Sequence, residues 1–307
     1  MTSRTGTRSS TWRRAASASS SAVAGHEEEG APAAGVVLKA PAFNPAGPRT
    51  APMAPPLVEY LLRLGDDRLV LGHRLSEWCG HAPVLEEDIA MANIALDLIG
   101  HASGLLALAG REEGQGRDED ALAYFRDGVR FRNALLVEVP NGDFAVTLVR
   151  QFLFDAHSVL LWDRLAQCGH AGLAAIAAKA LKEDQYHLRH SSGWVVRLGD
   201  GTDESHRRAQ AALDALWRFT GELFEADAVD AAVAELGIVV DHEARRALWE
   251  GMVADVAQRA TLVLPEGGAT RGAFMRMGGR RGFHTEHLGH LLATMQSVAR
   301  AHPGARW

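Results

Sequence analysis

One helical segment, residues 174–194, constrains this chain most, because it carries ionisable side chains on the same stripe as its apolar ones. Its apolar and small residues recur at helical spacing, namely Ile176, Ala177, Ala180, Leu181, Leu188 and Trp194. Asp184 and His187 stand three residues apart on that stripe, so both side chains are expected to point into the core. Helices of carboxylate-bridged di-metal bundles present their ligands in this way. A core histidine bonded to a nearby aspartate is the simpler alternative.

Three other long amphipathic segments accompany this one, and together they predict an all-α fold. The four helices are expected at residues 57–78, 84–109, 144–167 and 174–199. The first two and the last two form antiparallel hairpins because their connections are short, and a long crossover over residues 110–143, with one short amphipathic helix, joins the hairpins. This order predicts a ferritin-like four-helix bundle. Additional C-terminal helices are expected at 206–236, at 241–265 and from about Thr285, and no strand is predicted.

Each predicted hairpin places an acidic side chain opposite another one at similar depth. Asp66 and Asp97 form the first such pair, and Asp155 and Asp184 form the second. A di-iron bundle needs one Glu from each of two helices and a Glu-x-x-His from each of the other two. The sequence therefore offers the four carboxylates of a metal site, with His187 as one of its two histidines.

Two features of this set disfavour metal binding. Gly100 stands where the second histidine is needed, and His101 is rotated by about one hundred degrees from that stripe. All four acids are also Asp, whose side chain is shorter than that of Glu. We therefore predict a structural ionic network that binds no metal and has no catalytic residue, with His73, Arg150, Lys182 and His187 as partners of the acids. The rival interpretation is a metal-dependent oxygenase that uses Asp66, Asp97, Asp155, Asp184 and His187.

Residues 1–55 differ in composition from the rest of the chain. They are rich in Ser, Ala, Arg and Pro, and such a segment cannot bury enough apolar surface to offset its ordering entropy. We predict a disordered extension at 1–55 and a helical domain at 56–307, and Met53 is a candidate for the functional start.

Charge and hydropathy exclude two classes of partner. The net charge is −6 with acids and bases interleaved, so no basic stripe suggests a nucleic-acid partner. No uninterrupted apolar run reaches the length of about 20 residues needed to cross a bilayer, so no membrane is predicted.

On a Gly-rich loop, Arg280 and Arg281 suit the phosphates of CoA or the acidic surface of a partner. A solvated loop is the simpler interpretation, because charged side chains are mostly exposed.

Several blocks of the sequence are also recognisable as those of a family. These are LRLGDDRLVLGHRLSEWCGHAPVLEEDIAMANIALDLIGHA, LLVEVPNGDFAVTLVRQFLFDAH, AAKALKEDQYHLRHSSGWVVRLGDGTD, LWRFTGELF and GGRRGFHTEHLGHLLATMQ. They closely resemble the C subunits of ring-1,2-phenylacetyl-CoA epoxidases, in the phenylacetate catabolic protein family. The likeness runs from about Leu57 to Trp307, and nothing comparable covers residues 1–52.

The resemblance implies a bacterial, cytoplasmic protein of aerobic phenylacetate degradation. In this family a multicomponent monooxygenase epoxidises the ring of phenylacetyl-CoA with O2 and with electrons from NADPH, which a reductase subunit transfers. The A subunit holds the di-iron centre, the C subunit is a related chain without it that pairs with A in an obligate heterodimer, and the B subunit bridges such pairs. The resemblance thus implies a structural subunit that carries no cofactor of its own.

Overall fold

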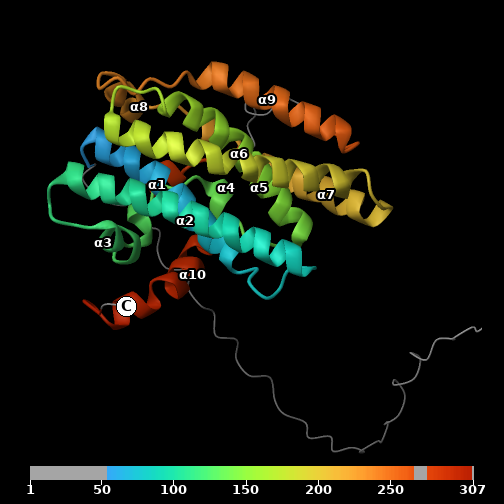
Figure 1. Ribbon diagram of the computed structural model, residues 1–307, viewed down its shortest axis with the longest axis horizontal. Helices are drawn as coiled ribbons and strands as arrows, with labels where there is room; N and C mark the ends of the chain where they lie inside the picture. Colours follow the sequence, from blue (N-terminus) through green and yellow to red (C-terminus); the bar gives the residue numbers. More distant parts are fainter. Residues whose placement is uncertain (1–53, 266–274, 306–307) are drawn as a thin grey trace, which may run out of the picture. The chain divides into compact units, whose positions relative to one another are not determined.

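The computed structural model describes residues 54–265 and 275–305, and this part of the chain is helical with no strand (Figure 1). The extension predicted at 1–55 lies almost entirely outside the described residues, and so does Met53. The predicted all-α class is confirmed.

Four long helices form two antiparallel hairpins, as predicted for a ferritin-like bundle. Their bounds are α1 Pro56–Ser76, α2 Leu85–Glu113, α5 Phe144–Leu165 and α6 Ala171–Gly199. The α1–α2 hairpin packs against the α5–α6 hairpin through the contact of α2 with α6. Asp143 and His170 cap the N-termini of α5 and α6 by accepting hydrogen bonds from backbone N–H groups.

The crossover between the hairpins contains several short pieces in place of the single helix that the sequence predicts. They are α3 Glu119–Tyr124, η1 Gly128–Arg130 and α4 Leu135–Glu138. Buried side chains of this segment, among them Phe131 and Leu136, belong to the main core. The crossover therefore closes one side of the bundle.

The C-terminal third adds further helices around the bundle. They are α7 Asp203–Trp217, η2 Gly221–Phe224, α8 Ala228–Ala234, α9 His242–Arg259, η3 Gly279–Arg281, α10 Glu286–Met295 and α11 Ser297–Ala301. The single helix predicted at 206–236 is wrong. Asp227 starts a new helix there, because it forms a capping box with Asp230 and so supplies a helix N-terminus within that stretch.

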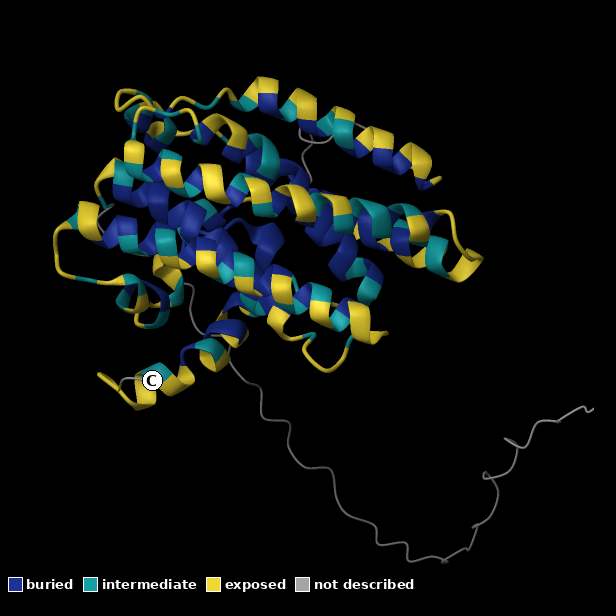
Figure 2. Cartoon of the chain, in the orientation of Figure 1, coloured by how far each residue is buried: buried dark blue, intermediate teal, exposed yellow. Residues whose placement is uncertain are grey.

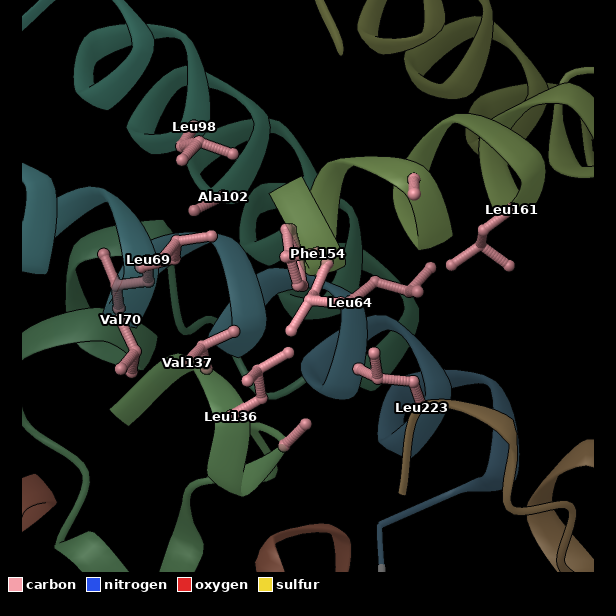
Figure 3. Close-up of a cluster of buried hydrophobic side chains, with 14 of the residues drawn as sticks. Leu64, Leu69, Val70, Leu98, Ala102, Leu136, Val137, Phe154, Leu161 and Leu223 are labelled. Atoms are coloured by element: carbon pink, nitrogen blue, oxygen red, sulfur yellow. The ribbon is translucent and has the colours of Figure 1, made fainter. Parts of the chain in front are cut away.

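The core surrounds α1, which is buried along almost its whole length and on every side (Figure 2). Apolar side chains from the bundle, the crossover and the C-terminal segment meet in one cluster (Figure 3). Its labelled members are Leu64, Leu69, Val70, Leu98, Ala102, Leu136, Val137, Phe154, Leu161 and Leu223. Polar residues of α1 are therefore also buried, and each of them needs a partner inside the protein.

Two helices, α2 and α5, have the length and apolar composition of a membrane span. Polar and charged residues interrupt both helices, so neither contains an uninterrupted apolar run of about 20 residues. Most of α5 is buried inside the bundle, and core helices commonly have this composition. The two helices are thus weak indicators, and no membrane is indicated.

Glycine allows α1 and α2 to pack closely. A Cβ atom on Gly72 would lie 2.9 Å from Ile99 Cγ1 and 3.1 Å from the backbone oxygen of Ala95. Because that oxygen belongs to a helix backbone, the two helices would have to move apart. A Cβ atom on Gly100, in contrast, would meet nothing within 4 Å.

We expect Gly72→Ala to lower the free energy of unfolding by about 1–3 kcal/mol, the usual range for overpacking. Gly100→Ala is the control and is expected to raise it by up to about 1 kcal/mol, because alanine is the better helix former. Urea denaturation followed by circular dichroism measures both. Equal effects of the two substitutions would contradict the packing described for α1 and α2.

Candidate functional site

The interior of the bundle brings together Asp155 on α5 with Asp184 and His187 on α6, all of them buried. The Oδ2 atom of Asp184 accepts hydrogen bonds from Ser158 Oγ at 2.5 Å and from Trp162 Nε1 at 2.8 Å. Both donors lie on α5, so this carboxylate ties the two helices of the second hairpin together. Asp155 lies near enough to Asp184 and His187 to interact with their charges, so the pairing of acids predicted for this hairpin is present.

An arginine from α1 enters the same interior. The Arg68 side chain is fully buried, and its guanidinium lies 4.1 Å from the centroid of the Trp162 ring. Its Nη2 atom donates to Ser158 Oγ at 2.8 Å, and its Nη1 atom donates to the backbone oxygen of Leu64 at 3.1 Å. Ser158 thus links Arg68 to Asp184. Burial lowers the pKa of Arg68, and the charge of Asp184 opposes that shift.

Two imidazoles flank the other oxygen of Asp184. The Nδ1 atoms of His101 and His187 lie 3.7 Å and 3.3 Å from Asp184 Oδ1. Their outer nitrogens face the protein surface, where His101 Nε2 lies 2.6 Å from Glu183 and His187 Nε2 lies 3.0 Å from Asp97. A continuous polar row therefore runs from the surface through the buried carboxylate and back to the surface.

The buried stripe of α2 differs from the predicted one. Asp97 and Gly100 are predicted to lie on the inner stripe, whereas Ile94, Leu98, His101 and Leu105 are the buried residues. The prediction that His101 lies off the stripe is wrong, because the helix is rotated by about one residue, or 100°. Asp97 lies at the edge of the core with 41% of its side chain exposed.

Asp66 lies away from Asp97, so the pairing predicted for the first hairpin is wrong. Asp66 is fully buried, but it forms a two-pronged ion pair with Arg126 of the crossover and accepts the backbone N–H of Arg132 at 2.8 Å. The sequence provides no simple signal of this contact, since Asp66 and Arg126 are 60 positions apart.

Among the four cations predicted to neutralise the inward acids, only His187 does so in the described residues. Arg150 donates to the backbone oxygen of Val139 and to Asn141 Oδ1, and not to an acid. Burial lowers the pKa of His73. The main partners are Arg68 and Arg126, which sequence reasoning missed because charged helix residues are usually exposed.

Burial and mutual charges change the acidity of this cluster. Burial raises the pKa of Asp155 to about 7, against the effect of His187 and of hydrogen bonds from Ser191 and Gln151. Burial alone lowers the pKa of His187, but its close contact with Asp184 and the charges of the nearby carboxylates outweigh burial and raise the pKa to about 9. The pKa of Asp184 is lowered, because the histidines and Arg68 outweigh its burial.

The two loop arginines have different environments. Arg280 forms a two-pronged ion pair with Asp67 at 2.8 and 3.0 Å and also donates to the backbone oxygens of Arg63 and Arg132. The solvated loop predicted for it is therefore wrong, and its guanidinium is engaged inside the protein and not available to CoA. Arg281 is exposed.

The donor set does not fit a pair of metal ions. A di-iron bundle needs four carboxylates and two histidines directed at one centre. Here α1 directs the cation Arg68 into the interior in place of a carboxylate. In α2, the residue three positions before His101 is Leu98, where a Glu-x-x-His motif needs a Glu. Only Asp155 and Asp184 remain as carboxylates, and in the described ranges no cluster of three or more His, Cys, Asp or Glu has the arrangement of a metal site. The buried guanidinium of Arg68, linked to Asp184 through Ser158, also adds a fixed positive charge that disfavours a metal cation there.

We expect Arg68→Met to lower the free energy of unfolding by about 3–5 kcal/mol, because Asp184 then lacks its buried guanidinium. Arg68→Lys keeps the charge and is expected to lose less, although it cannot reproduce the planar contacts. Denaturant unfolding of these variants, with Asp184→Asn and the double variant, gives the coupling energy. A coupling energy near zero between positions 68 and 184 would contradict the contact of Arg68 with Asp184 through Ser158.

Asp155 predicts a pH dependence of stability. Its folded pKa is raised from 3.8 to about 7, so the folded state binds more protons than the unfolded state between these values. The contribution of Asp155 to the free energy of unfolding is fully present below the pKa of its carboxyl in the unfolded chain. This contribution is lost as the pH rises through about 7. We expect Asp155→Asn to flatten the fall in unfolding free energy between pH 5 and pH 7.5, measured by urea titration. A parallel fall in both proteins would exclude Asp155 as its source.

The comparisons with known proteins agree with this architecture. The sequence model of the phenylacetic acid catabolic protein family matches residues 43–307. The chain is also similar to the C subunit of the 1,2-phenylacetyl-CoA epoxidase of Escherichia coli (strain K12), with 53% identity over 251 residues, which cover 82% of this chain and 99% of that protein. The chain therefore belongs to the phenylacetic acid catabolic protein family.

Proposed function

We propose that this chain is the non-catalytic structural subunit of a phenylacetyl-CoA epoxidase. Its role is to dock and stabilise a homologous catalytic A subunit. The chain is similar, over nearly the whole length of that relative, to a protein named as the C subunit of such an enzyme, and this supports the assignment to the assembly. The contact of Arg68 with Asp184 through the Ser158 hydroxyl supports the structural role.

The single observation that carries this proposal is the guanidinium of Arg68 in the bundle interior. A buried carboxylate needs a counter-charge, which in a di-iron bundle is the metal. Here Ser158 connects Asp184 to Arg68 by hydrogen bonds of 2.5 and 2.8 Å. The counter-charge is therefore a side chain that cannot exchange or change oxidation state, which suits rigidity and not redox chemistry.

The proposal assigns the chemistry to other subunits. The di-iron centre belongs to the A subunit, NADPH supplies electrons through the reductase, and the B subunit bridges pairs of A and C. Phenylacetyl-CoA is bound by the complex, in the cytoplasm. For this chain only Arg281 remains as a candidate for contact with CoA, because Arg280 is paired with Asp67.

The rival function is a metal-dependent oxygenase in its own right. One feature favours it, namely that His101, Asp184 and His187 direct three atoms toward one another. Asp66 and Asp97 do not join them, since Asp66 pairs with Arg126 and Asp97 lies at the edge of the core. Substitution of His187 distinguishes the two functions.

We expect the purified complex of this chain with its A subunit to keep its iron content and its rate of ring epoxidation when His187→Gln is introduced here. Iron is measured by atomic emission and turnover by oxygen consumption with phenylacetyl-CoA. The control is the A subunit produced without this chain, which is expected to be poorly soluble. Loss of iron from a His187→Gln complex that still assembles would favour the rival function.

A further inference from the structure

The outer side of α2 carries exposed apolar side chains at helical spacing. Leu85, Ile89 and Leu96 are 72%, 54% and 66% exposed. Gly100 and Ser103 continue the same stripe and are also exposed. Water contact along such a stripe is unfavourable, by about 25 cal/mol for each Å2 of apolar surface. Contiguous exposed apolar patches of more than a few hundred Å2 mark interaction sites in soluble proteins.

The neighbouring helix α6 extends this surface and adds positive charge. Tyr186 is 66% exposed, and the guanidinium of Arg189 lies 5.0 Å from the centroid of its ring. Lys179 and Lys182 are exposed on the same side of α6, and Lys179 Nζ lies 3.5 Å from Glu183. These cations stand out on a chain whose net charge is −6.

Three histidine–carboxylate pairs join α2 to α6 along their seam. Glu87 contacts His190 at 2.8 Å, Asp97 contacts His187 at 3.0 Å, and Glu183 contacts His101 at 2.6 Å. The order of these pairs shows that the helices run antiparallel. Glu87, Asp97 and Glu183 are therefore engaged by histidines within the protein. The outer side of α2 and α6 carries exposed residues (Figure 2).

We call this surface the α2–α6 face and define it by Leu85, Ile89, Leu96, Lys182 and Tyr186. Both helices have 29 residues, so each is about 43 Å long at a rise of about 1.5 Å per residue. Two such helices side by side, each about 10 Å wide, present on the order of 800 Å2. That is the area that each partner contributes to a standard stable interface.

We propose that the α2–α6 face is the docking surface for the helical A subunit of the same assembly. That subunit presents an apolar helix stripe flanked by carboxylates. A second copy of this chain fits poorly, because a two-fold contact centred on the face would bring Lys182 and Arg189 close to the same residues of the copy. The inference rests on the proposed function, which supplies the existence of a partner subunit, and it adds the surface and the chemistry of the contact.

The experiment measures the dissociation constant of the co-expressed, purified complex of the A subunit with the full chain by analytical ultracentrifugation of a dilution series. Leu96→Glu places a negative charge in the apolar stripe and is expected to weaken binding at least tenfold. Leu248→Glu is the matched control, because Leu248 is a 54% exposed leucine on α9. It is expected to change the affinity less than twofold. Circular dichroism confirms that both variants fold, as their exposure predicts.

Charge reversal tests whether the exposed cations of the α2–α6 face contribute to binding. Lys182→Glu is expected to weaken binding several-fold at low salt, with a smaller loss at high salt because exposed charges are screened. Arg259→Glu on α9 is its control and is expected to have no effect. Hydrogen–deuterium exchange of the wild-type complex is expected to show protection at residues 85–103 and 175–193.

The possible outcomes distinguish an error in the docking surface from an error in the proposed function. Wild-type binding that Leu96→Glu leaves unchanged, or that Leu248→Glu weakens equally, overturns the α2–α6 face while the proposed function stands. A wild-type chain that does not bind the A subunit overturns the proposed function. Self-association that Leu96→Glu abolishes would identify a second copy as the occupant and overturn the proposed partner.

Discussion

The structure depends on the neutralisation of buried charge around α1. Three consecutive residues of this helix, Asp66, Asp67 and Arg68, are all fully buried and point in three directions. Asp66 pairs with Arg126 of the crossover, Asp67 pairs with Arg280 of the C-terminal loop, and Arg68 enters the bundle interior. Successive helix residues are about 100° apart, so the three contacts surround the helix. They explain why crossover, C-terminal segment and bundle form one unit around α1.

Buried ion pairs of this kind specify an arrangement more than they stabilise it. Burying two charges costs free energy that their attraction only partly offsets, but removal of one partner leaves the other uncompensated. A packing of the crossover that moved Arg126 away from Asp66 would therefore be strongly disfavoured. The ion pairs of α1 therefore specify where the crossover and the C-terminal loop pack.

Much of the fold can be predicted from sequence periodicity, whereas the polar cluster inside the bundle can be predicted only in part. The four long helices could be predicted because their apolar stripes are long, and Asp184 and His187 because they share such a stripe. The register of α2 could not be predicted, because this helix carries apolar residues on two sides, and His101 was placed outside. Arg68 was missed for a related reason, since only the wrapping of α1 by distant segments makes a charged residue there internal.

The central claim is that the guanidinium of Arg68 replaces a metal ion between α1, α2, α5 and α6. Its most direct test is an anomalous-scattering map of the crystalline complex with the A subunit, recorded at the iron absorption edge. The account predicts iron peaks in the A subunit only, with ordered density for the Arg68 side chain linked to Ser158 in this chain. An iron peak beside Asp184 of this chain would contradict it.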